Sequence, residues 1–224
     1  MAVIYAFGDS ITYGAWDVAG SGRASRLRVW IDAKADKDAE YYCLLYNLGI
    51  PGETTRGLVK RFETEIKARD RDSENENAVF IFAFGANDSA LLDNEGNFAV
   101  SIDEFGSNLA GVIEKAKTIS KKIILLNITP VIDEITGKPN HRDKVRLNKY
   151  IEQYNKAVDE LATKHDVAHL DIYSLFMNAG HTKLFDEDGL HPNSLGHKII
   201  FDAVRPVLEK LLQDHTLSSF TSHH

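Results

Sequence analysis

The sequence predicts an α/β fold in which helices cover both faces of a parallel sheet. Short apolar runs rich in β-branched and aromatic residues recur at 3–7, 41–49, 78–84, 122–128 and 167–172. These runs are continuous rather than alternating, as in strands that are buried on both faces. Segments with the apolar spacing of helices lie between them, and strands that alternate with helices form βαβ units with parallel strands.

The helical segments follow the strands in order. Leu58, Phe62 and Ile66 recur on one helical face after the second run. Similar stripes occur within 105–116, 150–161 and 199–211. We interpret these stripes as the core-facing sides of helices.

Loops are expected where these patterns stop. The acidic stretch 70–77 reads as a solvated loop. The segments 12–30, 88–101 and 130–143 are expected to surround the edge of the sheet, where they would decide substrate size.

Length and composition limit the class of protein. The chain has 224 residues, of which 43% are hydrophobic, and this fits one domain at 1–213 followed by a polar, flexible tail at 214–224. The closing His223-His224 is either native or the remnant of a tag. The net charge of −7 and the lack of a basic stripe oppose a nucleic-acid partner. The single cysteine, Cys43, lies in an apolar run and is expected to be a small core residue.

The apolar segments and the first residues of the chain predict its cellular location. No segment approaches the roughly 20 apolar residues of a membrane span, and residues 1–7 lack a basic region and a cleavage site. We therefore expect a cytoplasmic protein. The oligomeric state is open, because the sheet accounts for every apolar stripe.

The site is expected where the strands end, since ligands of such sheets bind beyond the carboxyl ends of the strands. The first run ends in Gly8-Asp9-Ser10, the second in Asn47-Leu48-Gly49, and the third in Gly85-Ala86-Asn87-Asp88. Glycine, serine and asparagine therefore gather at this edge.

Ser10 is a candidate nucleophile only if a histidine oriented by an acid can take its proton. Two histidines have an acid three residues earlier: His169 after Asp166, and His191 after Asp188. The first pair lies on a strand, where residues three apart point to opposite faces. We therefore choose Asp188 and His191, although a purely structural role for their Gly- and Pro-containing loop remains open. The remaining histidines include His141, His165, His181, His197 and His215, which we interpret as ordinary solvent or packing residues.

An acyl transfer also needs donors for the oxyanion. Candidates are the N–H of Ser10, the N–H of Gly49 and the side-chain amide of Asn87, each at the end of a predicted strand. A turn glycine and a turn-stabilising asparagine are the alternatives for the last two. Asp9 and Asp88 are interpreted as acids that hold their loops.

Two groups of side chains are candidates for contact with the substrate. Three apolar side chains are candidates for an acyl pocket, with packing beneath loops as the alternative: Tyr13, Trp16 and Leu91. Three basic side chains in the segment VIDEITGKPNHRD are candidates for contact with a polar or anionic substrate, with a solvated loop as the alternative: Lys138, His141 and Arg142.

Four blocks in this order resemble the SGNH hydrolases, also called the GDSL lipase/esterase family. They are Gly8-Asp9-Ser10-Ile11-Thr12, Gly49, Gly85-Ala86-Asn87-Asp88, and Asp188-Gly189-Leu190-His191-Pro192. The resemblance implies a flavodoxin-like α/β/α sandwich with five parallel strands, a Ser10–His191–Asp188 triad, and an oxyanion hole of Ser10, Gly49 and Asn87. It also implies ester hydrolysis without a metal or cofactor.

Several readings of the activity remain. Short-chain esters or acetylated sugars are the expected substrates, and thioesterase or lysophospholipase activity is the alternative for the same triad. The rival from another class is a flavodoxin-like protein that binds phosphate at Asp9-Ser10-Ile11-Thr12. That rival gives Asp188 and His191 no role, and the acid at position 9 would repel an anion.

Overall fold

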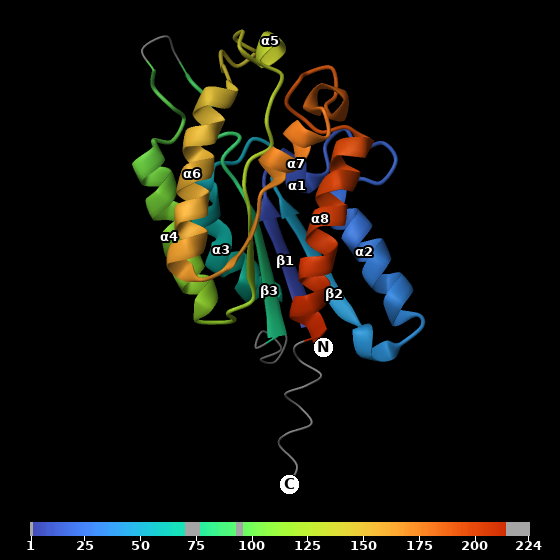
Figure 1. The fold of residues 1–224 in the computed structure, drawn as a ribbon. Helices are drawn as coiled ribbons and strands as arrows, with labels where there is room; N and C mark the ends of the chain where they lie inside the picture. Colours follow the sequence, from blue (N-terminus) through green and yellow to red (C-terminus); the bar gives the residue numbers. More distant parts are fainter. Residues whose placement is uncertain (1, 70–76, 93–95, 214–224) are drawn as a thin grey trace.

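Five parallel strands in the order β2-β1-β3-β4-β5 form the centre of the fold (Figure 1). The strands are β1 (Ala2–Gly8), β2 (Cys43–Gly49), β3 (Ala78–Ala83), β4 (Ile123–Leu126) and β5 (Ala168–Leu170). This computed structural model describes residues 2–69, 77–92 and 96–213. Most of the acidic stretch, the proposed tail and His215 lie outside the described residues. The predicted α/β class with a five-stranded parallel sheet is confirmed.

β1 is the central strand, and its pairing explains why its run is continuously apolar. It pairs with β2 from Ala2 opposite Cys43 to Gly8 opposite Gly49, and with β3 on its other side. Every residue of β1 is buried. The order of the strands reverses direction at β1, which places a topological switch point beside the loop that follows it.

Two helical layers cover the sheet, one on each face (Figure 1). Tyr5 and Phe7 face one core cluster, whereas Ile4 and Ala6 face the other. The first cluster is covered by α3 (Thr55–Arg69), α4 (Ile102–Lys117) and α6 (Asn148–His165). The second is covered by α2 (Gly22–Ala35), α7 (Ile172–Asn178) and α8 (Ser194–Gln213). The side chains of successive β1 residues thus alternate between two apolar cores.

The largest departure from the expected elements is α2. Much of its sequence was expected to be a loop within 12–30, because charged residues interrupt its apolar spacing. Ala24, Leu27 and Ile31 nevertheless form a buried stripe that packs on the sheet. Tertiary packing therefore stabilises a helix whose own pattern is weak.

Four strands, β2 to β5, are shorter than their apolar runs, and β4 and β5 each lose three residues. Tyr41 belongs to a 3-10 helix, η1 (Ala39–Tyr41), before β2 starts at Cys43. β5 ends before Asp171, because that side chain accepts a hydrogen bond from the N–H of Ser174 and caps α7. Cys43 is buried in the core, as expected.

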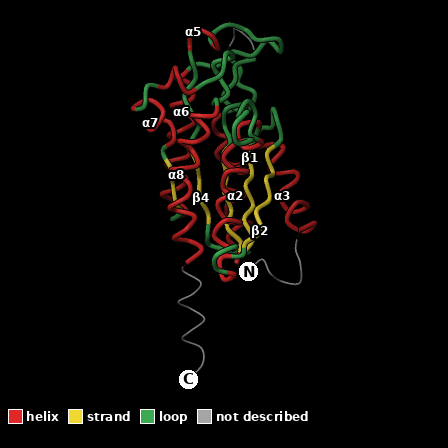
Figure 2. The backbone as a smooth tube through the Cα atoms, turned by 90° about the vertical axis from the view of Figure 1, so that its right-hand side faces the viewer, coloured by secondary structure: helices red, strands yellow, loops and turns green. Residues whose placement is uncertain are grey.

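The carboxyl ends of the strands meet at one edge of the molecule, and loops gather there (Figure 2). Short elements lie among them: α1 (Ser10–Tyr13), α5 (Asp133–Thr136) and a 3-10 helix, η3 (His181–Leu184). No helix within the described ranges is long and apolar enough to cross a membrane.

Candidate active site

The loop after β1 presents Ser10 at the edge of the sheet. Gly8 is required there because a Cβ would lie 1.9 Å from Oγ1 of Thr12 and 2.8 Å from the carbonyl oxygen of Ala83. Oδ1 of Asp9 accepts a hydrogen bond from the N–H of Ile11 at 2.9 Å and caps α1. Ser10 is therefore the first helical residue, where backbone N–H groups have no partner within the helix.

Ser10, His191 and Asp188 form one hydrogen-bonded chain. Oγ of Ser10 lies 2.7 Å from Nε2 of His191, and Nδ1 of His191 lies 2.5 Å from Oδ2 of Asp188. An ionised carboxylate only accepts hydrogen bonds, so Nδ1 carries the proton of the neutral ring. Nε2 is then the acceptor that faces the hydroxyl of Ser10.

The turn before α8 holds Asp188 as an anion. Its Oδ1 accepts hydrogen bonds from the N–H groups of Leu190 and His191, both at 2.9 Å. Burial by itself raises the pKa of Asp188, but the hydrogen bonds from His191 and these N–H groups outweigh it and lower the pKa to about 2. The compact turn has Gly189 at φ +67°, a conformation that favours glycine.

Trp16 contacts the carboxylate of Asp188. The sequence had placed this side chain in an acyl pocket instead. Its Nε1 donates to Oδ2 of Asp188 at 3.2 Å, and its ring packs edge-on against His191 with centroids 6.3 Å apart. Tyr13 is 58% exposed, and Leu91 is held in backbone bridges to neighbouring segments. None of the three expected acyl-pocket residues lines the hollow at Ser10.

Asn87 is positioned by Arg146, which the sequence did not indicate. Nη2 of Arg146 donates to Oδ1 of Asn87 at 3.0 Å, while its Nε donates to the carbonyl of Ala86 at 2.8 Å. Nδ2 of Asn87 donates to the carbonyl of Glu53 at 3.1 Å and reaches Oδ2 of Asp9 only at 3.4 Å. Arg146 thus fixes which end of the amide is the donor end, and one Nδ2–H is only weakly engaged.

Gly49 does not present its N–H to the site. That N–H donates to Oδ1 of Asn47 at 3.0 Å, and a Cβ at Gly49 would lie 2.2 Å from the backbone nitrogen of Tyr13. The glycine therefore allows β2 to approach α1 closely, and it is not placed as an oxyanion donor.

Gly52 occupies the position expected of Gly49. It lines the hollow together with Ser10 and Asn87, and its N–H has no acceptor among the described residues. Ile50, Pro51, Gly52 and Glu53 form a turn closed by a 3.1 Å hydrogen bond, with Gly52 at φ +80°. A Pro-Gly pair is typical of a type II turn, and this sequence signal would have identified the loop.

Asp9 and Asp88 are acids of the supporting loops, in agreement with their expected roles. Oδ1 of Asp88 accepts hydrogen bonds from the N–H and Oγ1 of Thr55 at 2.9 and 2.6 Å. Burial raises the pKa of Asp88 to about 6, against the opposing effect of these bonds. Burial also raises the pKa of Asp9. Neither carboxylate contacts His191 through a hydrogen bond that the structure shows.

Two adjoining hollows open beside the triad. One of about 190 Å³ includes Ser10, Gly52 and Asn87, and the other, of about 330 Å³, extends along Asp188 and His191. Both are bordered by the segment that follows α5. His141 is exposed, as expected of a solvent-facing histidine, and it lines both hollows.

The other described histidines have packing roles. His165 pairs with Glu114 at 2.7 Å, and His169 pairs with Asp159 at 3.0 Å. Nε2 of His197 lies 3.1 Å from the carbonyl of Ala15, and burial lowers the pKa of His197 to about 4.

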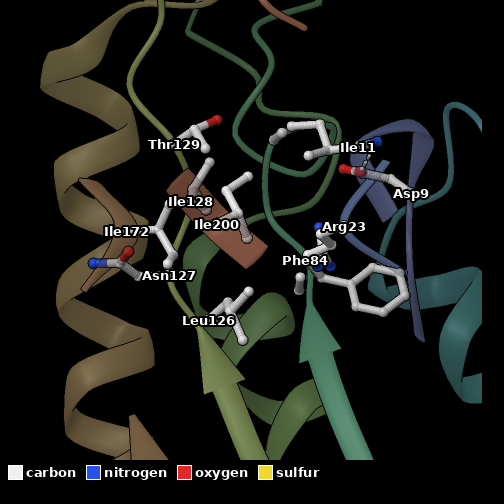
Figure 3. A pocket seen from close by; sticks show the side chains of 12 residues that line it. Asp9, Ile11, Arg23, Phe84, Leu126, Asn127, Ile128, Thr129, Ile172 and Ile200 are labelled. Atoms are coloured by element: carbon white, nitrogen blue, oxygen red, sulfur yellow. Dashed lines mark hydrogen bonds between the residues drawn. The ribbon is translucent and has the colours of Figure 1, made fainter. Parts of the chain in front are cut away.

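A third cavity lies behind the Ser10 loop and contains no member of the triad (Figure 3). Aliphatic side chains from the strand ends and nearby helices form most of its wall, with Asp9 and Arg23 as its charged members. Its volume of about 30 Å³ admits a water molecule rather than an ester. The described residues contain no group of three or more His, Cys, Asp or Glu side chains arranged to hold a metal ion.

Comparison with known proteins agrees with this site. Residues 6–199 match the GDSL-like lipase/acylhydrolase family. A human protein named isoamyl acetate-hydrolyzing esterase 1 homolog is 28% identical over 215 residues, which cover 91% of this chain and 80% of the human one.

Two solved structures share the fold. A lipase/acylhydrolase from Enterococcus faecalis superposes with a TM-score of 0.73 at 24% identity, covering 94% of this chain and 96% of that one. An acetylxylan esterase from Geobacillus stearothermophilus has a TM-score of 0.68 at 21% identity, covering 92% and 93%. The family match spans most of the chain, from β1 into α8, and includes every residue of the Ser10–His191–Asp188 chain. The protein therefore belongs to the GDSL-like lipase/acylhydrolase family, the SGNH hydrolases, and is a carboxylic ester hydrolase.

Proposed function

We propose that this protein hydrolyses short-chain carboxylic esters, acetyl esters above all, through an acyl-enzyme on Ser10. The observation that carries the proposal is the continuous chain from Oγ of Ser10 to Nε2 of His191 at 2.7 Å and from Nδ1 of His191 to Asp188 at 2.5 Å. A serine hydroxyl becomes a useful nucleophile when an oriented base can take its proton.

The reaction follows from these positions. Nε2 of His191 takes the proton while Oγ of Ser10 bonds to the carbonyl carbon, and the C=O electron pair moves onto the oxygen. Asp188 stabilises the imidazolium that forms. His191 then gives the proton to the departing alkoxide as the C–O bond breaks, and a water molecule repeats the sequence on the acyl-enzyme.

The oxyanion is stabilised by three donors in this proposal. They are the N–H of Ser10, the N–H of Gly52, and the Nδ2–H of Asn87 that reaches Asp9 only at 3.4 Å. The first two have fixed backbone positions and the third is oriented by Arg146. Donors that are in place before the reaction stabilise the transition state without reorganising.

A small acyl group is supported by the hollow at Ser10, whose volume of about 190 Å³ is below the range usual for drug-sized ligands. Acetyl esters are also supported by two similar proteins, since the human relative is named for the hydrolysis of isoamyl acetate and the Geobacillus protein is an acetylxylan esterase.

Turnover of p-nitrophenyl acetate, butyrate and octanoate tests this function, together with labelling by an organophosphonate. We expect the highest kcat/KM for acetate or butyrate and a single phosphonylated residue, Ser10. Ser10→Ala should lose both the turnover and the label. Ser107→Ala, on the exposed side of α4, serves as the matched control and should keep both. Wild-type protein with neither turnover nor label would overturn the proposal, as would full activity in Ser10→Ala.

A further inference from the structure

An excess of positive charge borders the two hollows beside the triad, although the chain carries a net charge of −7. The cations come from the segment after α5, and they are Lys138, Arg142, Lys144 and Arg146. None of these four forms an ion pair within 4.0 Å with a carboxylate of the described residues. Asp188 is the one acid among the described residues that line the hollows, and it is bonded to His191.

The segment is held in place by its own hydrogen bonds. Oδ1 of Asn140 accepts from the N–H groups of Arg142 and Lys144 at 2.9 and 3.1 Å. The backbone of Val145 pairs with that of Leu91 through bonds of 2.9 and 3.1 Å. The cations are therefore mounted on an ordered backbone before any ligand arrives, which lowers the entropic cost of binding one.

Two of the four cations, Lys144 and Arg146, are partly removed from water, whereas Lys138 and Arg142 are exposed. Arg146 is 5% exposed and donates only to neutral oxygens, those of Ala86 and Asn87. Lys144 is half-buried, and burial together with Arg146 and Arg142 lowers its pKa. Nη1 of Arg142 lies 3.5 Å from the position of a Cβ on Gly52. Partly buried cations that form no ion pair are costly, and a bound anion would offset that cost.

The position of this charge relative to the triad indicates which part of the ester it meets. Ser10, Gly52 and Asn87 surround the smaller hollow, where the carbonyl must lie. The larger hollow includes Lys138 but neither Ser10 nor Asn87, and His191 and Lys144 line both hollows. Arg142 lines only the smaller one. Because His191 returns its proton to the leaving oxygen, the alcohol part of the ester must lie on the side of His191.

We propose that the physiological ester carries an anionic group, a carboxylate or a phosphate, on its alcohol part, and that Lys138 and Lys144 of the larger hollow bind that group. This inference rests on the proposed ester hydrolysis at Ser10 and names the class of its substrate. This anionic group would be the ion-pair partner that these side chains do not have among the described residues. Its attraction also raises the rate of encounter, and added salt weakens it.

A pair of esters that differ only in charge tests the proposal. The probes are 3-acetoxybenzoate and its methyl ester, and the readout is the ratio of their kcat/KM values after division by their rates of alkaline hydrolysis. We expect the wild-type ratio to favour the anion at least tenfold. Lys138→Gln and Lys144→Gln should each lower the ratio about tenfold, through KM. Glycerol 3-phosphate acetylated on a hydroxyl, paired with glycerol monoacetate, tests phosphate against carboxylate in the same variants.

Lys156→Gln provides the matched control. Lys156 lies on α6, is 79% exposed, pairs with Glu160 at 3.8 Å and lines neither hollow. The ratio should be unchanged in this variant. Turnover of the neutral methyl ester reports folding and chemistry in every protein tested.

The possible results separate the two proposals. Turnover of the neutral ester with no anionic preference, or a preference that Lys138→Gln and Lys144→Gln leave unchanged, overturns the anionic substrate and leaves the esterase standing. If mono-4-nitrophenyl succinate, charged on its acyl side, shows the variant-dependent preference instead, the assignment to the alcohol part is overturned.

A binding measurement tests the anion site even if the protein hydrolyses none of these esters. Ser10→Ala is titrated calorimetrically with 3-acetoxybenzoate, alone and combined with Lys144→Gln. Binding that weakens about tenfold in the combined variant supports the anion site even if the wild-type protein hydrolyses neither ester. No detectable binding at millimolar concentration overturns the site.

Discussion

The loops around Ser10 hold carboxylates of two kinds. Asp188, in the turn before α8, is 40% exposed at its side chain, and hydrogen bonds from His191 and nearby N–H groups lower its pKa to about 2. Asp9 and Asp88, in the loops after β1 and β3, are buried, and burial raises their pKa values. The acids adjacent in sequence to Ser10 and Asn87 are thus the ones least suited to remain charged.

This difference shows that an acid next to a catalytic residue in the sequence need not take part in the chemistry. Asp9 and Asp88 accept hydrogen bonds from Ile11, Asn87 and Thr55, so they hold the loops that present Ser10 and Asn87. Asp188 faces an imidazole that must become positive during the reaction. A carboxylate can stabilise that charge only where donors keep it ionised.

Asp188→Asn tests the comparison most strongly. The asparagine can donate toward Nδ1, which would favour the ring tautomer with its proton on Nε2, facing Ser10. We expect kcat for p-nitrophenyl acetate to fall about 10³- to 10⁴-fold, as in other triads. Asp186→Asn, in the same turn, is the control and should stay within a few-fold of wild type. Near-wild-type turnover in Asp188→Asn would show that the ionised acid is not needed.

Asn87→Ala tests the residue that the buried acid Asp9 touches. Its amide is the one side-chain donor in the proposed oxyanion hole, so we expect kcat to fall about 10²- to 10³-fold with a smaller change in KM. Single-turnover measurements with p-nitrophenyl acetate separate acylation from product release. A wild-type acylation rate would remove Asn87 from the hole.

Asp88→Asn tests the raised pKa of a buried acid through the pH dependence of the free energy of unfolding. The folded protein keeps the Asp88 proton up to about pH 6, whereas the unfolded chain loses it near the ordinary aspartate pKa of 3.8. The free energy of unfolding should therefore fall as pH rises from 4 to 6 in wild type relative to Asp88→Asn, by up to about 3 kcal/mol. Urea denaturation at several pH values measures this difference.

Asp188→Asn gives the opposite comparison in the same experiment. In the wild-type protein, the lowered pKa of Asp188 stabilises the folded state above about pH 4, and that contribution is lost as pH falls through 4 toward 2. The Asp188→Asn variant lacks this dependence on pH. Parallel pH profiles for wild type and Asp88→Asn would contradict the contrast between the two kinds of acid.

Trp16→Phe should give the smallest effect. It removes the 3.2 Å hydrogen bond to Asp188 but keeps an aromatic ring beside His191. Asp188 retains its other donors, so we expect kcat to fall about two- to fivefold. A loss above a hundredfold would give the indole a direct part in the reaction.

The sequence by itself determined the features that depend on short stretches of chain. Continuous apolar runs gave the five parallel strands, because a strand covered on both faces has no polar side. The Gly8-Asp9-Ser10 loop and the three-residue step from Asp188 to His191 are local, so their geometry follows from one turn each. Asn87 could be placed at the same edge, because the carboxyl ends of parallel strands meet there.

Only the tertiary structure decided which groups from different segments meet. Gly52 rather than Gly49 faces Ser10 because the fold packs β2 tightly against α1. Arg146 reaches Asn87 across 59 positions, and Trp16 reaches Asp188 across 172. The cations of the segment after α5 face the triad only through the packing of that segment. Such contacts depend on the orientation of whole elements, which the residues on either side of each position do not encode.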